Sequence, residues 1–204
     1  MELKTILAKL NHHTPSVLGR ERISKYAVML PLIQKEDGIH VLFEVRSYEL
    51  RRQPGEICFP GGRIDPKDAD EKDAAMRETC EELGIKKDDI LEVFPLDFMI
   101  SPFEMMIYPF AGLIKGSKTL SPNRSEVSEV FMVPLTFFMQ NPPAIYQINF
   151  KVEPEENFPF ELIAGGENYN WRTRAADEHF YNYEGRIIWG LTARILSHFI
   201  DIIK

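Results

Sequence analysis

The 204-residue sequence contains only two cysteines, Cys58 and Cys80. Two cysteines are too few for a disulfide scaffold, and they lack the CxxC spacing of a zinc site. The sequence also lacks an apolar run long enough to cross a membrane, and residues 1–13 lack the apolar stretch of a signal peptide. These absences predict a protein of a reducing, cytoplasmic environment with no membrane partner.

Positive charge is also scarce, because 24 Lys and Arg residues stand against 31 Asp and Glu residues and leave a net charge of −7. Nucleic-acid binding depends on clustered basic residues, so this balance argues against a nucleic-acid partner. A small anionic substrate remains compatible with it, since local arginines or a bound metal ion can reverse the field within one cleft. The five histidines show no HxH or HExxH spacing, so no histidine-based metal site is expected.

The length predicts a single domain with an insertion, and the hydrophobic periodicity predicts a mixture of helices and strands. Two apolar runs around a Lys-Glu-Asp-Gly turn predict a hairpin, and the polar segment 46–62 is expected to be a loop. The strongest helical pattern covers 68–83, with Asp65 or Asp68 as its N-cap. The other expected elements are a helix at 1–13, strands at 26–33, 40–45, 90–100, 106–114 and 127–133, an insertion at 141–170 with one strand pair at 144–152, and a terminal helix at 187–203.

Three glutamates of the expected helix 68–83, namely Glu78, Glu81 and Glu82, are spaced at i, i+3 and i+4 and therefore lie on adjacent turns of one face. Like charges this close destabilise a helix unless a cation neutralises them, and Mg²⁺ or Mn²⁺ prefers carboxylate oxygen ligands. A solvated acidic surface would explain the same spacing. The diglycine turn at 59–62, directly upstream, favours a ligand site, because paired glycines let the backbone approach a ligand.

Residues 62–85, GRIDPKDADEKDAAMRETCEELGI, resemble the Nudix box, a glycine followed by the pattern REUxEExGU in which U is bulky and aliphatic. The matching positions are Gly62, Arg77, Glu78, Glu81, Glu82, Gly84 and Ile85. The chain departs from the box because one extra residue precedes Arg77, the family's upstream glutamate falls at Ala69, and Thr79 replaces an aliphatic residue. Three acidic residues are candidates to replace that glutamate, namely Asp68, Asp70 and Glu71. The resemblance implies an α/β/α sandwich with a mixed β-sheet, in which the box forms a loop-helix-loop catalytic motif.

An upstream constellation narrows this resemblance, and it consists of Arg46-Ser47, Arg51, Gly55 and Phe59-Pro60-Gly61-Gly62. It is similar to the signature of coenzyme A pyrophosphatases within the Nudix family, LLTxRSxxxRxxxGxxxFPGG, although Phe43 and Glu44 depart from the strand part. Residues 188–193 also look like the start of the last helix of that subfamily. Coenzyme A carries several phosphates, and arginines supply forked donors that match phosphate oxygens.

The resemblance therefore implies a set of substrate-binding residues, namely Arg46, Arg51, Arg52, Gly61 and Gly62. The alternative is that the arginines only solubilise the loop or pair with nearby carboxylates, which are Glu44, Glu49 and Glu56.

The implied activity is metal-dependent hydrolysis of a nucleoside diphosphate-type pyrophosphate, with coenzyme A or acyl-CoA cleaved to adenosine 3′,5′-bisphosphate and (acyl-)4′-phosphopantetheine. The metal ligands would be Glu78, Glu81 and Glu82, which would hold one to three Mg²⁺ or Mn²⁺ ions across the diphosphate. Arg77 would orient a box carboxylate through a bidentate pair. The general base remains open among three carboxylates, Glu82, Glu126 and Glu129.

Two alternative functions fit the same residues. One is a Nudix pyrophosphatase for another substrate, such as ADP-ribose, NADH or another nucleotide. The other is a catalytically silent Nudix-fold regulatory module, against which the intact carboxylate face argues. A homodimer formed through residues 141–170 is compatible with the sequence, although nothing in the sequence requires one.

Overall fold

The computed structural model describes residues 2–101, 103–116 and 119–204. These residues form an eight-stranded sheet whose path runs β3-β2-β1-β7-β5, with β4 paired to β1, β6 to β7 and β8 to β2. Strands β1 and β7 run parallel and the other paired strands run antiparallel, so the expected mixed sheet is confirmed. The strands are β1 (Ser24–Lys35), β2 (Gly38–Arg46), β3 (Ile57–Cys58), β4 (Gly61–Arg63), β5 (Ile90–Pro95), β6 (Met99–Ser101), β7 (Met105–Ile114) and β8 (Val127–Pro134).

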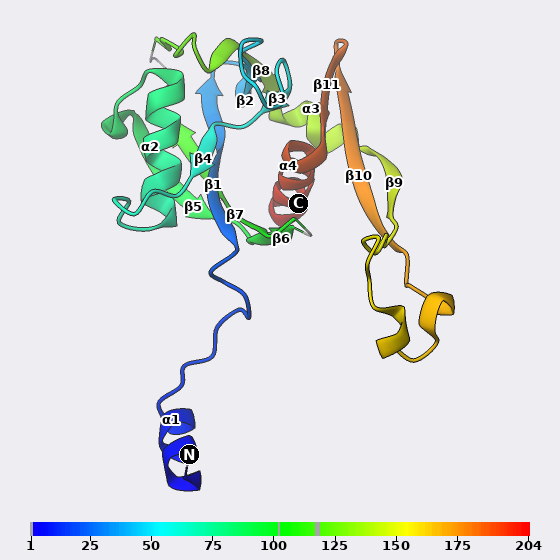
Figure 1. Ribbon diagram of the computed structural model, residues 1–204. Helices are drawn as coiled ribbons and strands as arrows, with labels where there is room; N and C mark the ends of the chain where they lie inside the picture. Colours follow the sequence, from blue (N-terminus) through cyan, green and yellow to red (C-terminus); the bar gives the residue numbers. More distant parts are fainter. Residues whose placement is uncertain (1, 102, 117–118) are drawn as a thin grey trace.

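Helices cover both faces of this sheet, as Figure 1 shows, and confirm the expected α/β/α sandwich. Met29 of β1 lies in a buried cluster with Ala74 and Ala75 of α2, whereas its neighbour Leu30 lies in a cluster with Leu196 of α4. Successive side chains of a strand point to opposite faces, so one strand serves both cores. The helices are α1 (Leu3–Asn11), α2 (Glu71–Leu83), α3 (Leu135–Gln140) and α4 (Gly190–Ile203).

A second sheet, ordered β11-β10-β9, is antiparallel and packs against α4. Its strands are β9 (Ala144–Phe150), β10 (Arg174–Tyr183) and β11 (Arg186–Trp189). The expected strand pair within 144–152 is wrong, because that segment forms one strand and its partner β10 lies beyond the insertion. The expected helix start at 187 is also wrong, because residues 187–189 belong to β11. The chain turns into α4 at Gly190, which has a φ of 62°.

Several expected boundaries also differ from the structure. Asp70 caps α2 by accepting a hydrogen bond from Asp73 N at 2.7 Å, so the expected cap at Asp65 or Asp68 is wrong. The expected strand 90–100 is divided into β5 and β6, because β5 ends at Pro95, which has no amide hydrogen. The expected loop 46–62 contains β3 and the start of β4.

The predicted first helix is confirmed as α1, which buries none of its residues and lies away from the sheet in Figure 1. Among the described residues, no helix is long and apolar enough to span a bilayer.

Candidate active site

The diglycine turn lies between the sheet and helix α2. Gly62 pairs with Ala27 of β1, so this turn is held against the central strand. A Cβ at Gly61 would lie 2.5 Å from the backbone oxygen of Ala27, so only glycine permits this approach. From the same turn, the Gly61 N–H donates a hydrogen bond of 2.8 Å to Oε2 of Glu82. The turn therefore joins the sheet to the carboxylate-bearing half of α2.

The segment 121–127 closes over the C-terminal end of α2. Asn123 N donates to the backbone oxygen of Glu82 at 2.9 Å, which docks this segment on the helix. The backbone oxygen of Glu126 accepts a hydrogen bond of 2.7 Å from Ser47 N. The arginine-bearing loop and the carboxylate helix are therefore held together through one connecting segment.

Glu82 is the most buried of the three glutamates predicted as metal ligands, with 8% of its surface exposed. Burial raises the pKa of Glu82 to about 8, and the charges of Glu78 and Glu126 act in the same direction. The Gly61 N–H and the Arg46 guanidinium oppose this rise, because both favour the ionised carboxylate. Once its carboxyls are ionised, the site therefore carries more negative charge than its own arginine neutralises.

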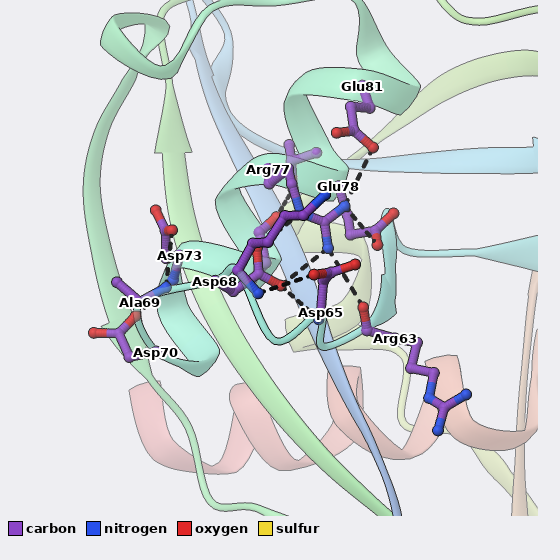
Figure 2. A network of polar contacts seen from close by, with 12 residues as sticks. Arg63, Asp65, Asp68, Ala69, Asp70, Asp73, Arg77, Glu78 and Glu81 are labelled. Atoms are coloured by element: carbon purple, nitrogen blue, oxygen red, sulfur yellow. Dashed lines mark hydrogen bonds and ion pairs between the residues drawn. The ribbon is translucent and has the colours of Figure 1, made fainter.

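Arg77 lies at the centre of the polar network in Figure 2. Its Nε and Nη2 donate to the two carboxylate oxygens of Asp68 at 2.8 and 3.1 Å. Its Nη1 lies 2.9 Å from Glu78 Oε1 and 3.2 Å from Glu81 Oε2. The bidentate partner is thus Asp68, while one nitrogen contacts both helix carboxylates. Burial raises the pKa of the Glu78 carboxyl, and the adjacent Arg77 opposes that rise. Glu81 is exposed.

The three acidic residues considered in place of the upstream box glutamate have different partners. Asp68 contacts Arg77, and the hydrogen bond from that guanidinium lowers the pKa of the Asp68 carboxyl. Asp70 caps α2, and Glu71 lies 3.6 Å from Nζ of Lys25. Of these three residues, Asp68 is therefore the one whose carboxylate pairs with the box arginine, Arg77.

Glu44 on β2 also belongs to this cluster, and sequence reasoning missed it. The side chain is 1% exposed, and its pKa is raised first by burial and then by the charge of Glu82. Cys58 pairs with Glu44 across β2 and β3, and burial together with these carboxylates raises the pKa of the Cys58 thiol to about 12. A thiol with such a pKa is not a nucleophile near neutral pH. The feature of the sequence that could have identified Glu44 was its departure from the coenzyme A pyrophosphatase signature, which has threonine at this position.

The predicted arginines divide into two groups. Arg46 is half-buried, and its charge acts on both Glu44 and Glu82. Arg51 and Arg52 are exposed, and within the described ranges neither guanidinium has a hydrogen-bond or ion-pair partner. Pairing of these two arginines with loop carboxylates is therefore not found.

The two other candidates for the general base, Glu126 and Glu129, have different surroundings in the structure. Glu126 lies among the carboxylates, because its charge acts on Glu78 and Glu82. Glu129 instead forms an ion pair of 2.7 Å with Arg186 of β11, and that hydrogen bond lowers the pKa of the Glu129 carboxyl.

The chemistry of this donor set fits a divalent cation. In the described part of the chain, no three Asp, Glu, His or Cys side chains already converge in a chelating geometry. The fit rests on the buried carboxylates Glu44 and Glu82, and Oε1 of Glu44 has no hydrogen-bond partner among the described residues. Hard cations such as Mg²⁺ and Mn²⁺ bind carboxylate oxygens and would neutralise this charge.

Alanine substitutions of the two glycines are expected to have different effects. In Gly61→Ala the new Cβ meets the backbone of β1, so we expect a loss of stability of a few kcal/mol. In Gly62→Ala the Cβ would lie 2.4 Å from Cδ of Glu78, a movable side chain, so we expect a folded protein with weaker cation binding. Urea denaturation and Mn²⁺ titration of both variants check this. Equal loss of stability in the two variants would contradict it.

The fold and the carboxylate helix define a Nudix-type α/β/α protein. The sequence matches the NUDIX domain family over residues 24–154, more than half of its length, and the chain belongs to this family.

Among curated relatives, the chain is 37% identical over 124 residues to the peroxisomal coenzyme A diphosphatase NUDT7 of Mus musculus, covering 61% of this chain and 52% of the mouse protein. It is 36% identical over 115 residues to the peroxisomal coenzyme A diphosphatase ndx-8 of Caenorhabditis elegans, covering 54% and 49%. The chain thus spans about half the length of these relatives. A solved structure of the NUDIX domain of Shewanella oneidensis NrtR, complexed with ADP ribose, matches at 18% identity with a TM-score of 0.49 and covers 70% of this chain and 89% of that one.

Proposed function

We propose that this chain hydrolyses the diphosphate bond of coenzyme A or an acyl-CoA, releasing adenosine 3′,5′-bisphosphate and (acyl-)4′-phosphopantetheine. The main support is that the arginine-bearing loop and the carboxylate helix meet at one site, through the bonds from Ser47 N to Glu126 O and from Gly61 N to Glu82. The two relatives named as coenzyme A diphosphatases support the same substrate.

In this proposal Glu78, Glu81 and Glu82 bind Mg²⁺ or Mn²⁺ at the diphosphate. A divalent cation held by these carboxylates would supply charge neutralisation at the leaving phosphate and a lower pKa for the attacking water. Arg77 is a positioning residue, because its guanidinium contacts the carboxylates of Glu78 and Glu81 and would hold them in place. Water adds to one phosphorus, the phosphoanhydride bond breaks with its electron pair on the leaving phosphate, and Glu82 or Glu126 accepts the proton of the water.

A hollow of about 510 Å³ lies between loop 46–56 and the β10–β11 hairpin. Tyr48 and Trp189 contribute aromatic surface to its walls, and its one arginine, Arg186, is already paired with Glu129. An uncharged chain suits such a hollow better than a phosphate does, because no unpaired cation lines it. We therefore propose it for the pantetheine arm.

The 3′-phosphate of coenzyme A is assigned in this proposal to Arg51 and Arg52. Both side chains are exposed and without partners in the described ranges, and both lie on the loop that borders the hollow. Guanidinium groups bind phosphate oxygens through charge-assisted hydrogen bonds. The substrate would thus extend from the carboxylate helix along this loop.

Hydrolysis of a substrate panel tests the function. With Mg²⁺ or Mn²⁺ present, we expect coenzyme A to yield adenosine 3′,5′-bisphosphate, identified by mass spectrometry. The value of kcat/KM should exceed that for 3′-dephospho-CoA by about tenfold or more, because hydrogen bonds to a charged group contribute about 1.5 to 3 kcal/mol each. A preference for ADP-ribose or NADH would refute the coenzyme A assignment. No cation-dependent hydrolysis of any of these substrates would support the regulatory alternative.

A further inference from the structure

Glu44 is a buried carboxylate on strand β2 to which the proposed reaction gives no role. Its side chain is 1% exposed, and its Oε1 has no hydrogen-bond partner among the described residues. Burying an ionisable group without a partner is unfavourable, and such groups in native proteins need an explanation, such as a missing ion. The fold alone supplies no reason to keep a carboxylate at this position.

Strand alternation directs this carboxylate to the α2 side of the sheet. Leu42, two residues before Glu44, lies in the buried cluster that contains Leu83 of α2, and residues two apart on a strand share a face. The charged groups that act on Glu44 are Glu82, Arg46 and Glu126. Glu44 therefore lies on the side of the sheet that faces α2, near the carboxylates of the candidate active site.

Arg46 does not explain the burial of Glu44. The two residues form no hydrogen bond or ion pair within the described ranges, and Nε of Arg46 is itself buried without a partner. When Glu44, Glu82 and Glu126 are all ionised, their negative charge exceeds the single positive charge of Arg46. A divalent cation bound there would neutralise this charge.

We propose that Glu44 is an additional carboxylate ligand of the divalent cation that Glu78 and Glu82 bind. The inference rests on the proposed function, which gives the position of the cation. It adds a ligand from strand β2 to those on helix α2. Mg²⁺ and Mn²⁺ favour such oxygen ligands. The coenzyme A signature has threonine where this chain has Glu44, so the added carboxylate distinguishes this chain from that pattern.

Mn²⁺ binding to the full chain without substrate tests this role. Glu44→Gln keeps the shape of the side chain, and Glu44→Thr restores the residue of the signature. Both variants are expected to bind Mn²⁺ about tenfold or more weakly than the wild type, as measured by calorimetry or by electron paramagnetic resonance of free Mn²⁺. Glu92→Gln is the matched control, because Glu92 is an exposed strand glutamate on β5, and its affinity should be unchanged.

Thermal unfolding in the presence of EDTA provides a second measurement. The Glu44 variants should unfold at the wild-type temperature or above it, since they remove a buried unpaired carboxylate, and they should gain less from added Mn²⁺. If both variants bind Mn²⁺ with an affinity within twofold of the wild type, the proposal is overturned. If such variants are also less stable than the wild type without metal, Glu44 serves the fold alone. A wild-type protein that binds Mn²⁺ but cleaves no coenzyme A would refute the proposed function and leave this test valid.

Discussion

Replacing Glu82 with glutamine is expected to lower kcat by about two to four powers of ten at saturating Mg²⁺ or Mn²⁺. Glutamine preserves the size of the side chain and an oxygen that accepts the 2.8 Å hydrogen bond from Gly61 N, so the turn beneath α2 is retained. It removes the negative charge needed for cation binding or for accepting a proton from water. Steady-state kinetics with the cation titrated for each variant measure the effect, and the loss should persist at saturation.

Two further variants help to separate the candidates for the general base. Glu126→Gln should lower kcat, because Glu126 lies among the site carboxylates, whereas Glu129→Gln should have a smaller effect on kcat, because Glu129 is paired with Arg186. A kcat for Glu82→Gln within about tenfold of the wild type at saturating cation would contradict the role given to Glu82, since general acid–base catalysis alone contributes about 10²- to 10⁴-fold.

The carboxylate helix could be predicted from the sequence because its determinants are local. A spacing of i, i+3 and i+4 requires only that the segment be helical. Gly84 ends that helix in a left-handed conformation with a φ of 65°, which glycine adopts readily. Even the departure at Thr79 is accommodated locally, because its buried hydroxyl donates to the backbone oxygen of Ala75 at 2.7 Å.

The parts that could not be predicted depend on contacts between distant residues. Strand β9 pairs with β10, as in Ala144 with Phe180, across an insertion whose length and composition do not specify the partner. The same limit applies to Glu44, since alternation predicts two faces for β2 but not which face meets α2. The N-cap was ambiguous for a different reason, because Asp65, Asp68 and Asp70 are all capping residues and the hydrogen bond that selects Asp70 is a matter of loop geometry.

The metal-free protein is expected to become less stable as the pH rises from about 5 to about 8. The pKa of Glu82 is about 8 in the folded chain against an ordinary value of 4.5, and the pKa of Glu44 is shifted in the same direction. Between these values the unfolded chain releases a proton that the folded chain retains, so rising pH favours unfolding. Above about pH 8, Glu82 is ionised in both the folded and the unfolded chain. The free-energy cost of ionising it in the folded chain then no longer increases with pH.

Urea denaturation in EDTA at several pH values measures this dependence. Because one unit of pKa difference corresponds to about 1.4 kcal/mol, Glu82 alone accounts for a loss on the order of a few kcal/mol. Glu82→Gln should weaken the dependence, with the contribution of Glu44 remaining, and should be more stable than the wild type at pH 8. Glu92→Gln, which changes an exposed glutamate, should retain the wild-type dependence.

Added Mg²⁺ or Mn²⁺ should oppose this loss, because the cation and protons compete for the same carboxylates. The stabilisation by cation is therefore expected to be larger at pH 8 than at pH 5.5, and smaller in Glu82→Gln at both. A single substitution that stabilises the metal-free protein while lowering kcat would mean that the charge of Glu82 is retained for binding rather than for folding. Metal-free stability that is constant between pH 5 and 8, with equal cation effects at both ends, would contradict the presence of buried carboxylates that await a cation.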